Sequence, residues 1–177
     1  SARQHSYDGI VRDGLVLHLD AATFNTVTGT TWYDLSGNNN HGTLTNGPTY
    51  NSGNGGSIVF DGSDDRVSTS SNVILPNEMT WASWVNRTSS VNPYNMFMGR
   101  LLPYFSFRSS NDILFSNNIG GNQSSVYSSG FSGSNNTWYY FAFTTTYNGS
   151  STTMSIYING SFNNSAAYTG SQGQYSY

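Results

Sequence analysis

The chain has 177 residues, a length that predicts one domain with at most a short extension. Only 8% of the residues are charged, against about 25% in ordinary globular proteins. Lys is absent and Glu78 is the only Glu. An α-helical fold is therefore disfavoured, because helix surfaces usually contain both residue types. The net charge of −3 and six dispersed Arg exclude a basic patch for nucleic acid and a polybasic stretch for membranes, and no apolar run is long enough to insert into a bilayer.

Aromatic residues are abundant, with 13 Tyr, 10 Phe and 4 Trp. Aromatic side chains suit half-buried strands, and the remainder is rich in Asn, Ser, Thr and Gly, which are typical of turns. Many turns between short aromatic strands predict an all-β sandwich or barrel. No Cys is present to indicate a redox compartment, and low charge with high Asn, Ser and Thr favours an extracellular or particle surface.

The chain opens on a polar segment, residues 1–13, which we expect to be an arm or linker that docks the domain to something else. It starts without Met, so we expect a processed or excised chain. Residues 14–177 are expected to form one sandwich. Its first strand is predicted at Leu15–Asp20, where leucines alternate with other residues, and short strands are predicted at Ser57–Phe60 and Arg66–Ser68.

Later segments carry stronger strand signals. Thr80–Asn86 has apolar side chains on both faces, which predicts a strand covered on both sides. Tyr104–Arg108 and Ile113–Ser116 flank a predicted turn, and Trp138–Thr146 with Thr153–Asn159 predict an antiparallel hairpin followed by a type I′ turn at Asn159-Gly160. From the strand spacing we expect six buried side chains, namely Leu17, Phe60, Trp84, Phe141, Phe143 and Ile156.

A set of motifs in order along the chain resembles a known family. The motifs are Gly14–Ala21 (GLVLHLDA), Trp32–Asn38 (WYDLSGN), His41-Gly42, Phe60-Asp61-Gly62 with Asp65 and Val67, Met79–Val85 (MTWASWV), Trp138-Tyr139-Tyr140 and Ile156–Gly160 (IYING). Each is weak alone, but the ordered set, which covers Gly14 to Phe162, is similar to the laminin-G-like jelly roll. The resemblance implies an all-β, two-sheet antiparallel jelly-roll sandwich, concanavalin A-like, of the lectin/glucanase class.

The resemblance also implies a function. Such domains are usually non-catalytic modules of adhesins, sugar-binding proteins and virus surface proteins, and this composition is most similar to copies in phage virion proteins such as tail fibres and capsid decoration proteins. We therefore expect a structural or decorating module of a virion or other extracellular assembly, with protein neighbours as partners. The alternative is a carbohydrate-binding or adhesion module of a larger secreted protein, with cell-surface glycans as partners.

The match departs from the family at its end, where a closing strand with a G-x-I-D-x-V-type motif is missing. The segment Tyr168–Tyr177 is polar, and we expect it not to form a core strand. An unpaired sheet edge would invite another chain. We therefore expect more chain beyond Tyr177 or a neighbouring subunit at that edge.

Calcium is the metal that the sequence favours. Asp34, Ser36, Asn38 and Asn40 place side-chain oxygens at alternate positions, and oxygen is the ligand atom that Ca²⁺ takes. Relatives in the resembled family often hold Ca²⁺ at the sandwich rim, which favours this metal, and we expect Asp61 or Asp65 to supply a further ligand. The alternative interpretation of the Asp34–Asn40 segment is a hydrogen-bonded Asx loop without metal.

For glycan binding, aromatic rings near loops are the candidates, because rings stack on sugars. Trp32, Tyr33, Tyr94 and Tyr127 meet that description. Catalysis is not expected, although glycosidases share the resembled fold. Glycoside hydrolysis needs two carboxyl groups on either side of the bond, and the single Glu78 with scattered Asp cannot supply the paired motif.

Overall fold

The structure is a computed structural model, which describes residues 10–24, 29–69, 76–89, 94–99, 102–108 and 111–173. Apart from two short 3₁₀ helices, its regular elements are β-strands. The chain forms two compact units, of which the first extends to Val73 and the second is Ile74–Ser176. Within the described ranges no helix is long and apolar enough to cross a membrane.

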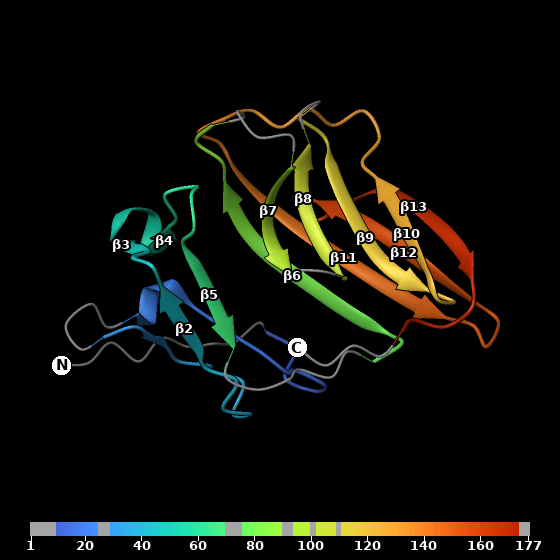
Figure 1. The fold of residues 1–177 in the computed structure, drawn as a ribbon, viewed down its shortest axis with the longest axis horizontal. Helices are drawn as coiled ribbons and strands as arrows, with labels where there is room; N and C mark the ends of the chain where they lie inside the picture. The colour runs from blue at the N-terminus through green and yellow to red at the C-terminus, as the bar shows by residue number, and fades with distance from the viewer. Residues whose placement is uncertain are drawn as a thin grey trace. The chain divides into compact units, whose positions relative to one another are not determined.

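The second unit is a sandwich of two four-stranded antiparallel sheets, which Figure 1 shows as two layers. The β8–β9 sheet has the order β10-β9-β8-β7 and contains β7 (Tyr94–Gly99), β8 (Tyr104–Arg108), β9 (Ile113–Ile119) and β10 (Asn122–Tyr127). The β11–β12 sheet has the order β13-β12-β11-β6 and contains β6 (Met79–Asn86), β11 (Trp138–Tyr147), β12 (Ser151–Ile158) and β13 (Ser161–Thr169). The predicted all-β sandwich is confirmed.

Aromatic rings from the two sheets meet in the core between them. Phe105 on β8 stacks on Phe143 on β11 with ring centroids 4.1 Å apart, and Phe115 on β9 lies 5.6 Å from the same Phe143 ring. Phe141, Phe143 and Ile156 are almost fully buried, as the sequence predicted. Alternate residues of β11 and β12 point inward, so the period-2 pattern of these strands alone places their core side chains.

The β11–β12 and β12–β13 hairpins follow the turn signals in the sequence. Phe143 pairs with Ile156 across β11 and β12, and Ile158 pairs with Ser161 across β12 and β13. Between the last two, Asn159 (φ 51°) and Gly160 (φ 81°) both have positive φ, as a type I′ turn requires. The Asn159 Oδ1 atom also accepts a hydrogen bond of 2.9 Å from the Tyr140 N–H.

The end of the described chain pairs with the sandwich through a single bridge and forms no named strand after β13 within the described residues. After β13, Gln172 forms a β-bridge with Ile119 of β9 and is only 2% exposed. The crossing depends on a close approach of two glycines, because a Cβ on Gly170 would lie 2.7 Å from the Gly120 Cα. A buried glutamine can pair within a core when the core supplies polar partners.

One edge of the sandwich is closed by side chains instead of by another strand. The Asn163 amide of β13 accepts from the Ser129 N–H (2.8 Å) and donates to the Ser129 carbonyl (3.0 Å). The Tyr168 hydroxyl donates to the Ser125 carbonyl and accepts from the Ser125 N–H (3.2 Å). Backbone groups along this edge, where β10 and β13 meet, are therefore partly satisfied within the chain.

The first unit consists of two small sheets. A three-stranded sheet has the order β1-β2-β5, with β1 (Thr31–Trp32), β2 (Gly42–Thr45) and β5 (Arg66–Thr69), and β3 (Thr49–Asn51) pairs with β4 (Ser57–Val59). The 3₁₀ helices are η1 (Ala21–Thr23) and η2 (Gly53–Gly55). The predicted strand at Leu15–Asp20 is reduced to a single bridge between Leu19 and Asp34, because side chains of the next loop hold its backbone instead.

Three of the six predicted core residues are exposed. Leu17 is 36% exposed, Phe60 46% and Trp84 63%. Leu17 lies outside regular strand, Phe60 follows the end of β4, and Trp84 is on the outward row of β6 beside Tyr140, with ring centroids 5.4 Å apart. The prediction that β6 is covered on both sides is therefore wrong at Trp84. Apolar residues are common at protein surfaces, so an apolar side chain on each face of a strand does not require that both faces be covered.

Candidate functional site

The first predicted metal loop is organised around the Asp34 carboxylate, which is 8% exposed. Its Oδ1 atom accepts hydrogen bonds from the N–H groups of His18 and Ser36, both at 2.9 Å. Its Oδ2 atom accepts from the Ser36 hydroxyl at 2.7 Å and from the Asn40 N–H at 3.0 Å. Both oxygens are thus satisfied by protein donors.

The amides of this loop bind backbone as well. Asn38 Nδ2 donates to the Leu15 carbonyl at 2.8 Å, and Asn40 Nδ2 donates to the Val16 carbonyl at 2.9 Å. Burial of Asp34 raises its pKa, but the hydrogen bonds from His18, Ser36 and Asn40 outweigh that effect and hold the pKa below its usual value. The geometry matches the hydrogen-bonded Asx loop, which was the alternative interpretation of this segment.

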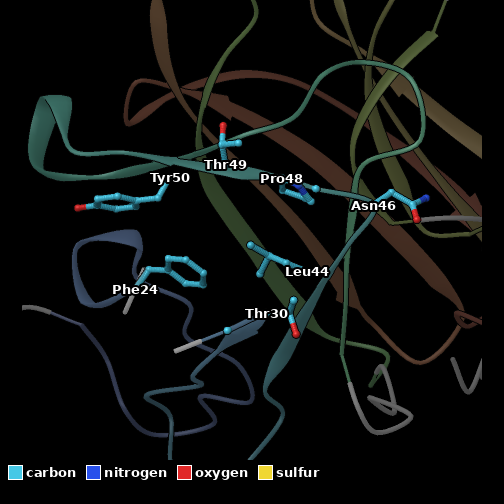
Figure 2. Close-up of a pocket in the computed structure, with 9 residues that line it drawn as sticks. Phe24, Thr30, Leu44, Asn46, Pro48, Thr49 and Tyr50 are labelled. Carbon is cyan, nitrogen blue, oxygen red and sulfur yellow. The ribbon is translucent and has the colours of Figure 1, made fainter. Parts of the chain in front are cut away.

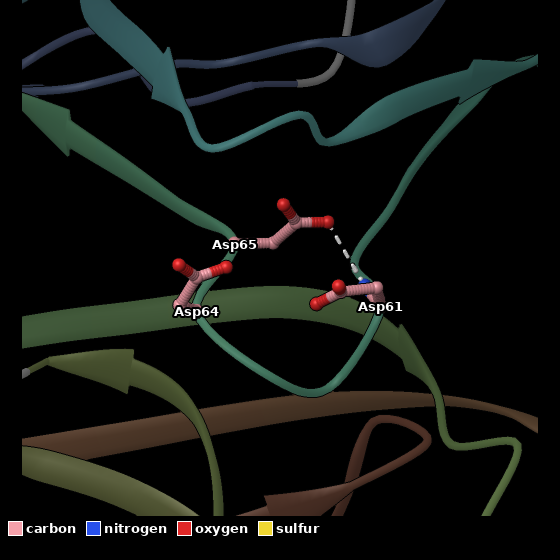
Figure 3. A group of neighbouring side chains, drawn as sticks. All are labelled: Asp61, Asp64 and Asp65. Carbon is pink, nitrogen blue, oxygen red and sulfur yellow. Dashed lines mark hydrogen bonds between the residues drawn. The ribbon is translucent and has the colours of Figure 1, made fainter.

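The structure gathers three other carboxylates in the turn between β4 and β5 (Figure 3). Oxygen atoms of Asp61, Asp64 and Asp65 lie within 4.8 Å of one another, and in the described ranges they are the one such group of three acidic or imidazole ligands. Asp61 and Asp65 were predicted as ligands together with Asp34. The structure adds Asp64 to them and leaves Asp34 out of the group.

Hydrogen bonds in this acidic turn leave one buried carboxylate oxygen without a partner. The Asp61 N–H donates to Asp65 Oδ2 at 2.9 Å, and the Asn46 amide donates to Asp64 Oδ2 at 2.9 Å. The Asp65 Oδ1 atom is buried and has no hydrogen-bond partner. Three carboxylates that include one buried, unpartnered oxygen form a donor set that suits a hard cation.

A shallow pocket of about 380 Å³ lies in the same unit (Figure 2). Figure 2 shows the rings of Phe24 and Tyr50 lying side by side with Leu44 beside them, and the two ring centroids are 6.1 Å apart. The Asn46-Gly47 turn lines the pocket and also contacts the acidic turn through the Asn46 amide. The Trp32 ring packs edge-on against Phe24 at 6.5 Å, so this predicted ligand residue supports the pocket wall.

The other predicted ligand-binding aromatics lie in different parts of the chain. Tyr33 is 56% exposed and packs edge-on against the His41 ring at 5.1 Å. Tyr127 is 44% exposed, and the Arg108 guanidinium lies 4.7 Å from its ring centroid. The Tyr94 side chain lies outside what the structure describes. Tyr33 is in the first unit and Tyr127 in the second.

Sequence reasoning missed a group of aromatic side chains on the outer face of the β11–β12 sheet. We call it the outer aromatic strip, and it consists of Trp84, Tyr140, Tyr157 and Phe162. Trp84 and Phe162 are 63% and 60% exposed. The signal that could have found it is the strand alternation, which puts Tyr140 and Tyr157 on the face opposite to Phe141 and Ile156.

Carboxyl groups of the second unit are engaged in contacts of their own. The Glu78 Oε1 atom accepts a hydrogen bond from the Tyr147 N–H at 3.3 Å. Asp112 pairs with Arg108, at 3.2 Å between Oδ2 and Nη1. A structural role is therefore enough to explain both carboxyl groups.

Comparison with known proteins places the fold in a family. The sequence model of the Concanavalin A-like lectin/glucanases superfamily, of laminin-G type, matches residues 61–177, which is more than half of the 177 residues. No curated protein and no solved structure gives a significant match. The matched region contains β5 and every strand of the sandwich. The chain therefore belongs to the Concanavalin A-like lectin/glucanases superfamily.

Proposed function

We propose that this domain is a non-catalytic module that binds glycans and works in adhesion. Membership of a lectin-type superfamily suggests this class of function. The observation that carries the proposal is that a lectin-type sandwich holds large aromatic side chains open to water on ordered strands. Exposing such rings forgoes the free energy that their burial would supply, about 1.5–3 kcal/mol for a large apolar side chain, and contiguous exposed apolar surface marks interaction sites.

The proposed absence of catalysis rests on the carboxyl groups. Glycosidases need two of them, about 5–5.5 Å apart in retaining enzymes or about 6.5–9.5 Å apart in inverting enzymes. The chain has a single Glu, Glu78, and its Oε1 atom is hydrogen-bonded to the Tyr147 backbone. We expect no release of reducing sugar from β-glucans by the purified domain. Turnover that disappears in Glu78→Gln would refute this part of the proposal.

The proposed setting is the surface of a virion or of another extracellular assembly, where the domain is a structural or decorating module. The support is compositional: 8% charged residues and many Asn, Ser, Thr and Gly. Antibodies against the domain should label intact particles at regular, repeated positions in electron micrographs. Labelling of a single secreted protein without any particle would favour the adhesion module of a larger secreted protein.

We further propose that the acidic turn is where this domain holds Ca²⁺. Its support is the convergence of Asp61, Asp64 and Asp65 and the buried, unpartnered Asp65 Oδ1 atom. A cation there would offset the mutual repulsion of three carboxylates, and it would stabilise the folded state by mass action. The melting temperature should rise with Ca²⁺ and fall with chelator, and Asp65→Asn should remove the response while Asp13→Asn keeps it. A wild-type melting temperature that ignores Ca²⁺ would contradict the proposal.

Glycan binding itself is tested with the purified domain on a broad glycan array. We expect binding to a restricted set of glycans, with the same preference in solution by calorimetry. Binding to none of them, by a domain shown to be folded, would refute the proposed function.

A further inference from the structure

The outer aromatic strip has one member on each strand of the β11–β12 sheet. Trp84 of β6 pairs directly with Tyr140 of β11, and Tyr157 of β12 pairs directly with Phe162 of β13. The paired rings touch, with centroids 5.4 Å and 5.7 Å apart. Four adjacent strands spaced about 4.8 Å apart give the strip a width of about 14 Å.

The residues beside the strip have small or hydroxyl side chains, which project less far from the sheet than the aromatic rings. Ala82, Ala142, Tyr157 and Phe162 form one row of pairs across the four strands, and Trp84 and Tyr140 lie in the neighbouring row, so the two aromatic pairs are offset by one row. The next row consists of hydroxyl residues on all four strands, in the pairing order Thr80, Thr144, Ser155 and Ser165. Thr80 and Ser165 on the two outer strands are exposed and Thr144 is half-buried, whereas Ser155 is only 9% exposed. The face therefore offers an aromatic band with exposed hydroxyl groups beside it on the outer strands.

The four strands of this face carry no charged side chain, and Glu78 lies just before β6, where its Oε1 atom accepts from the Tyr147 N–H. None of the residues of β6, β11, β12 and β13 is Asp, Glu, Lys, Arg or His. The opposite sheet differs, since Arg108 and Asp112 form an ion pair there. An uncharged surface gives no attraction to phosphate, sulfate or carboxylate groups, so nucleic acids, anionic lipids and acidic glycans are poor partners. Strands without charged side chains therefore suit a neutral ligand.

Sugars in a neutral polysaccharide present apolar C–H groups on one side of the ring and hydroxyl groups around it. Aromatic faces take the C–H side, and serine and threonine hydroxyls donate to and accept from the sugar hydroxyls. A strip that is open along its whole width suits a chain that passes over it, whereas a chain end would need an enclosing pocket. The strands hold the rings in place before binding, so little conformational entropy is lost.

We propose that the outer aromatic strip binds an extended, neutral polysaccharide chain laid across β6, β11, β12 and β13. This inference rests on the proposed glycan-binding function and adds the site and the ligand class. Trp84 and Phe162 are the main contacts, because they are the two most exposed members of the strip. Tyr140 and Tyr157 support them from the two inner strands.

The experiment measures retention of the purified 177-residue domain on cellulose, chitin and mixed-linkage β-glucan. The test variants are Trp84→Ala, Phe162→Ala and the double variant, and Trp84→Phe checks whether an aromatic ring suffices. Phe60→Ala is the matched control, because Phe60 is another exposed aromatic residue at 46% exposure and lies in the first unit. We expect at least one of the three polysaccharides to be bound, with at least a tenfold weaker affinity in the double variant and near wild-type affinity in Phe60→Ala and Trp84→Phe. Binding to the neutral chain should change little between low and high salt.

The outcomes separate this inference from the proposed function. If the glycan array is positive but the double variant binds as wild type, the function holds and the strip is the wrong site, and loss in Tyr33→Ala or Tyr127→Ala would place the site elsewhere. Binding to charged glycans only would overturn the ligand class. A wild-type domain that binds no glycan in either assay refutes both proposals. A domain that self-associates until Trp84 is replaced would show that a second copy covers the face, which also overturns the inference.

Discussion

Asn117 of β9 and Gln172 of the segment after β13 share a buried hydrogen bond, in which Asn117 Nδ2 donates to Gln172 Oε1 at 3.0 Å. Asn117 is fully buried and Gln172 is 2% exposed. The Thr145 hydroxyl of β11 also lies 3.4 Å from the same Gln172 oxygen. These three side chains join the end of the described chain to both sheets of the sandwich.

Removing either member of this pair should destabilise the domain. We expect Asn117→Ala or Gln172→Ala to lower the free energy of unfolding by about 1–3 kcal/mol, because each leaves a buried polar group without its partner. Asn122→Ala, at an exposed position of β10, should change the free energy by less than about 0.5 kcal/mol. Urea unfolding followed by tryptophan fluorescence measures all three, and equal effects would contradict the buried role of the pair.

The core and the outer face should respond in opposite ways to truncation. Phe143 is 1% exposed and stacks on Phe105, so Phe143→Ala should cost about 3–5 kcal/mol of stability. Trp84→Ala should cost under about 1 kcal/mol, because Trp84 is 63% exposed. Thermal and urea unfolding give both numbers. A large cost at Trp84 would mean that the outer face is covered in the folded protein.

Arg87 is a buried cation that organises two loops. Its Nη2 atom donates to Asn111 Oδ1 at 2.7 Å and to the Gly133 carbonyl at 3.1 Å, and its Nε atom donates to Asn135 Oδ1 at 3.0 Å. Its guanidinium carbon lies 4.4 Å from the Phe107 ring centroid.

Arg87→Ala should therefore destabilise the domain by about 2–4 kcal/mol, since the buried Gly133 carbonyl and two part-buried amide oxygens lose their donor at once. Arg87→Lys should recover only part of this loss, because an ammonium group cannot reproduce the planar fork. Hydrogen exchange should show faster exchange at the Asn136 N–H, which donates to the Arg87 carbonyl. Full recovery by Lys would show that only the charge matters.

Stability should depend on pH through Asp34. The folded-state pKa of Asp34 lies below its ordinary value because hydrogen bonds from His18, Ser36 and Asn40 favour the carboxylate over the opposing effect of burial. A lowered pKa stabilises the fold above about pH 4, and this contribution is lost as the pH falls through the folded-state pKa. Asp34→Asn should be less stable than wild type at pH 7, and the difference should narrow below about pH 4. Asp13→Asn serves as the control, and a difference that stays constant with pH would contradict this account.

Local sequence determined the strands with strong signals. The alternation in Trp138–Thr146 and Thr153–Asn159 fixed which side chains point inward, so Phe141, Phe143 and Ile156 were placed correctly. The Asn159-Gly160 pair fixed the next turn, because both residues tolerate the positive φ that a type I′ turn needs. These features depend on residues close together in the chain, and so the sequence by itself sufficed.

Tertiary structure alone decided which apolar side chains are covered. Trp84 and Trp81 have the same chemistry and lie on one strand, yet Trp81 packs on Phe105 in the core while Trp84 is exposed. A strand pattern shows that two faces exist and leaves open which face another sheet covers.

The tertiary structure also decided which polar residues from distant parts of the chain lie together. Asp34 was predicted beside Asp61 and Asp65, but the backbone N–H groups of His18 and Asn40 engage its carboxylate, and Asp64 completes the acidic turn instead. Gln172 lies in a polar segment and is buried because Asn117 and Thr145 supply polar partners inside the sandwich. Composition and alternation specify strands, whereas partners many residues away specify burial, because hydrogen bonds and packing act through space and leave no mark on the local pattern.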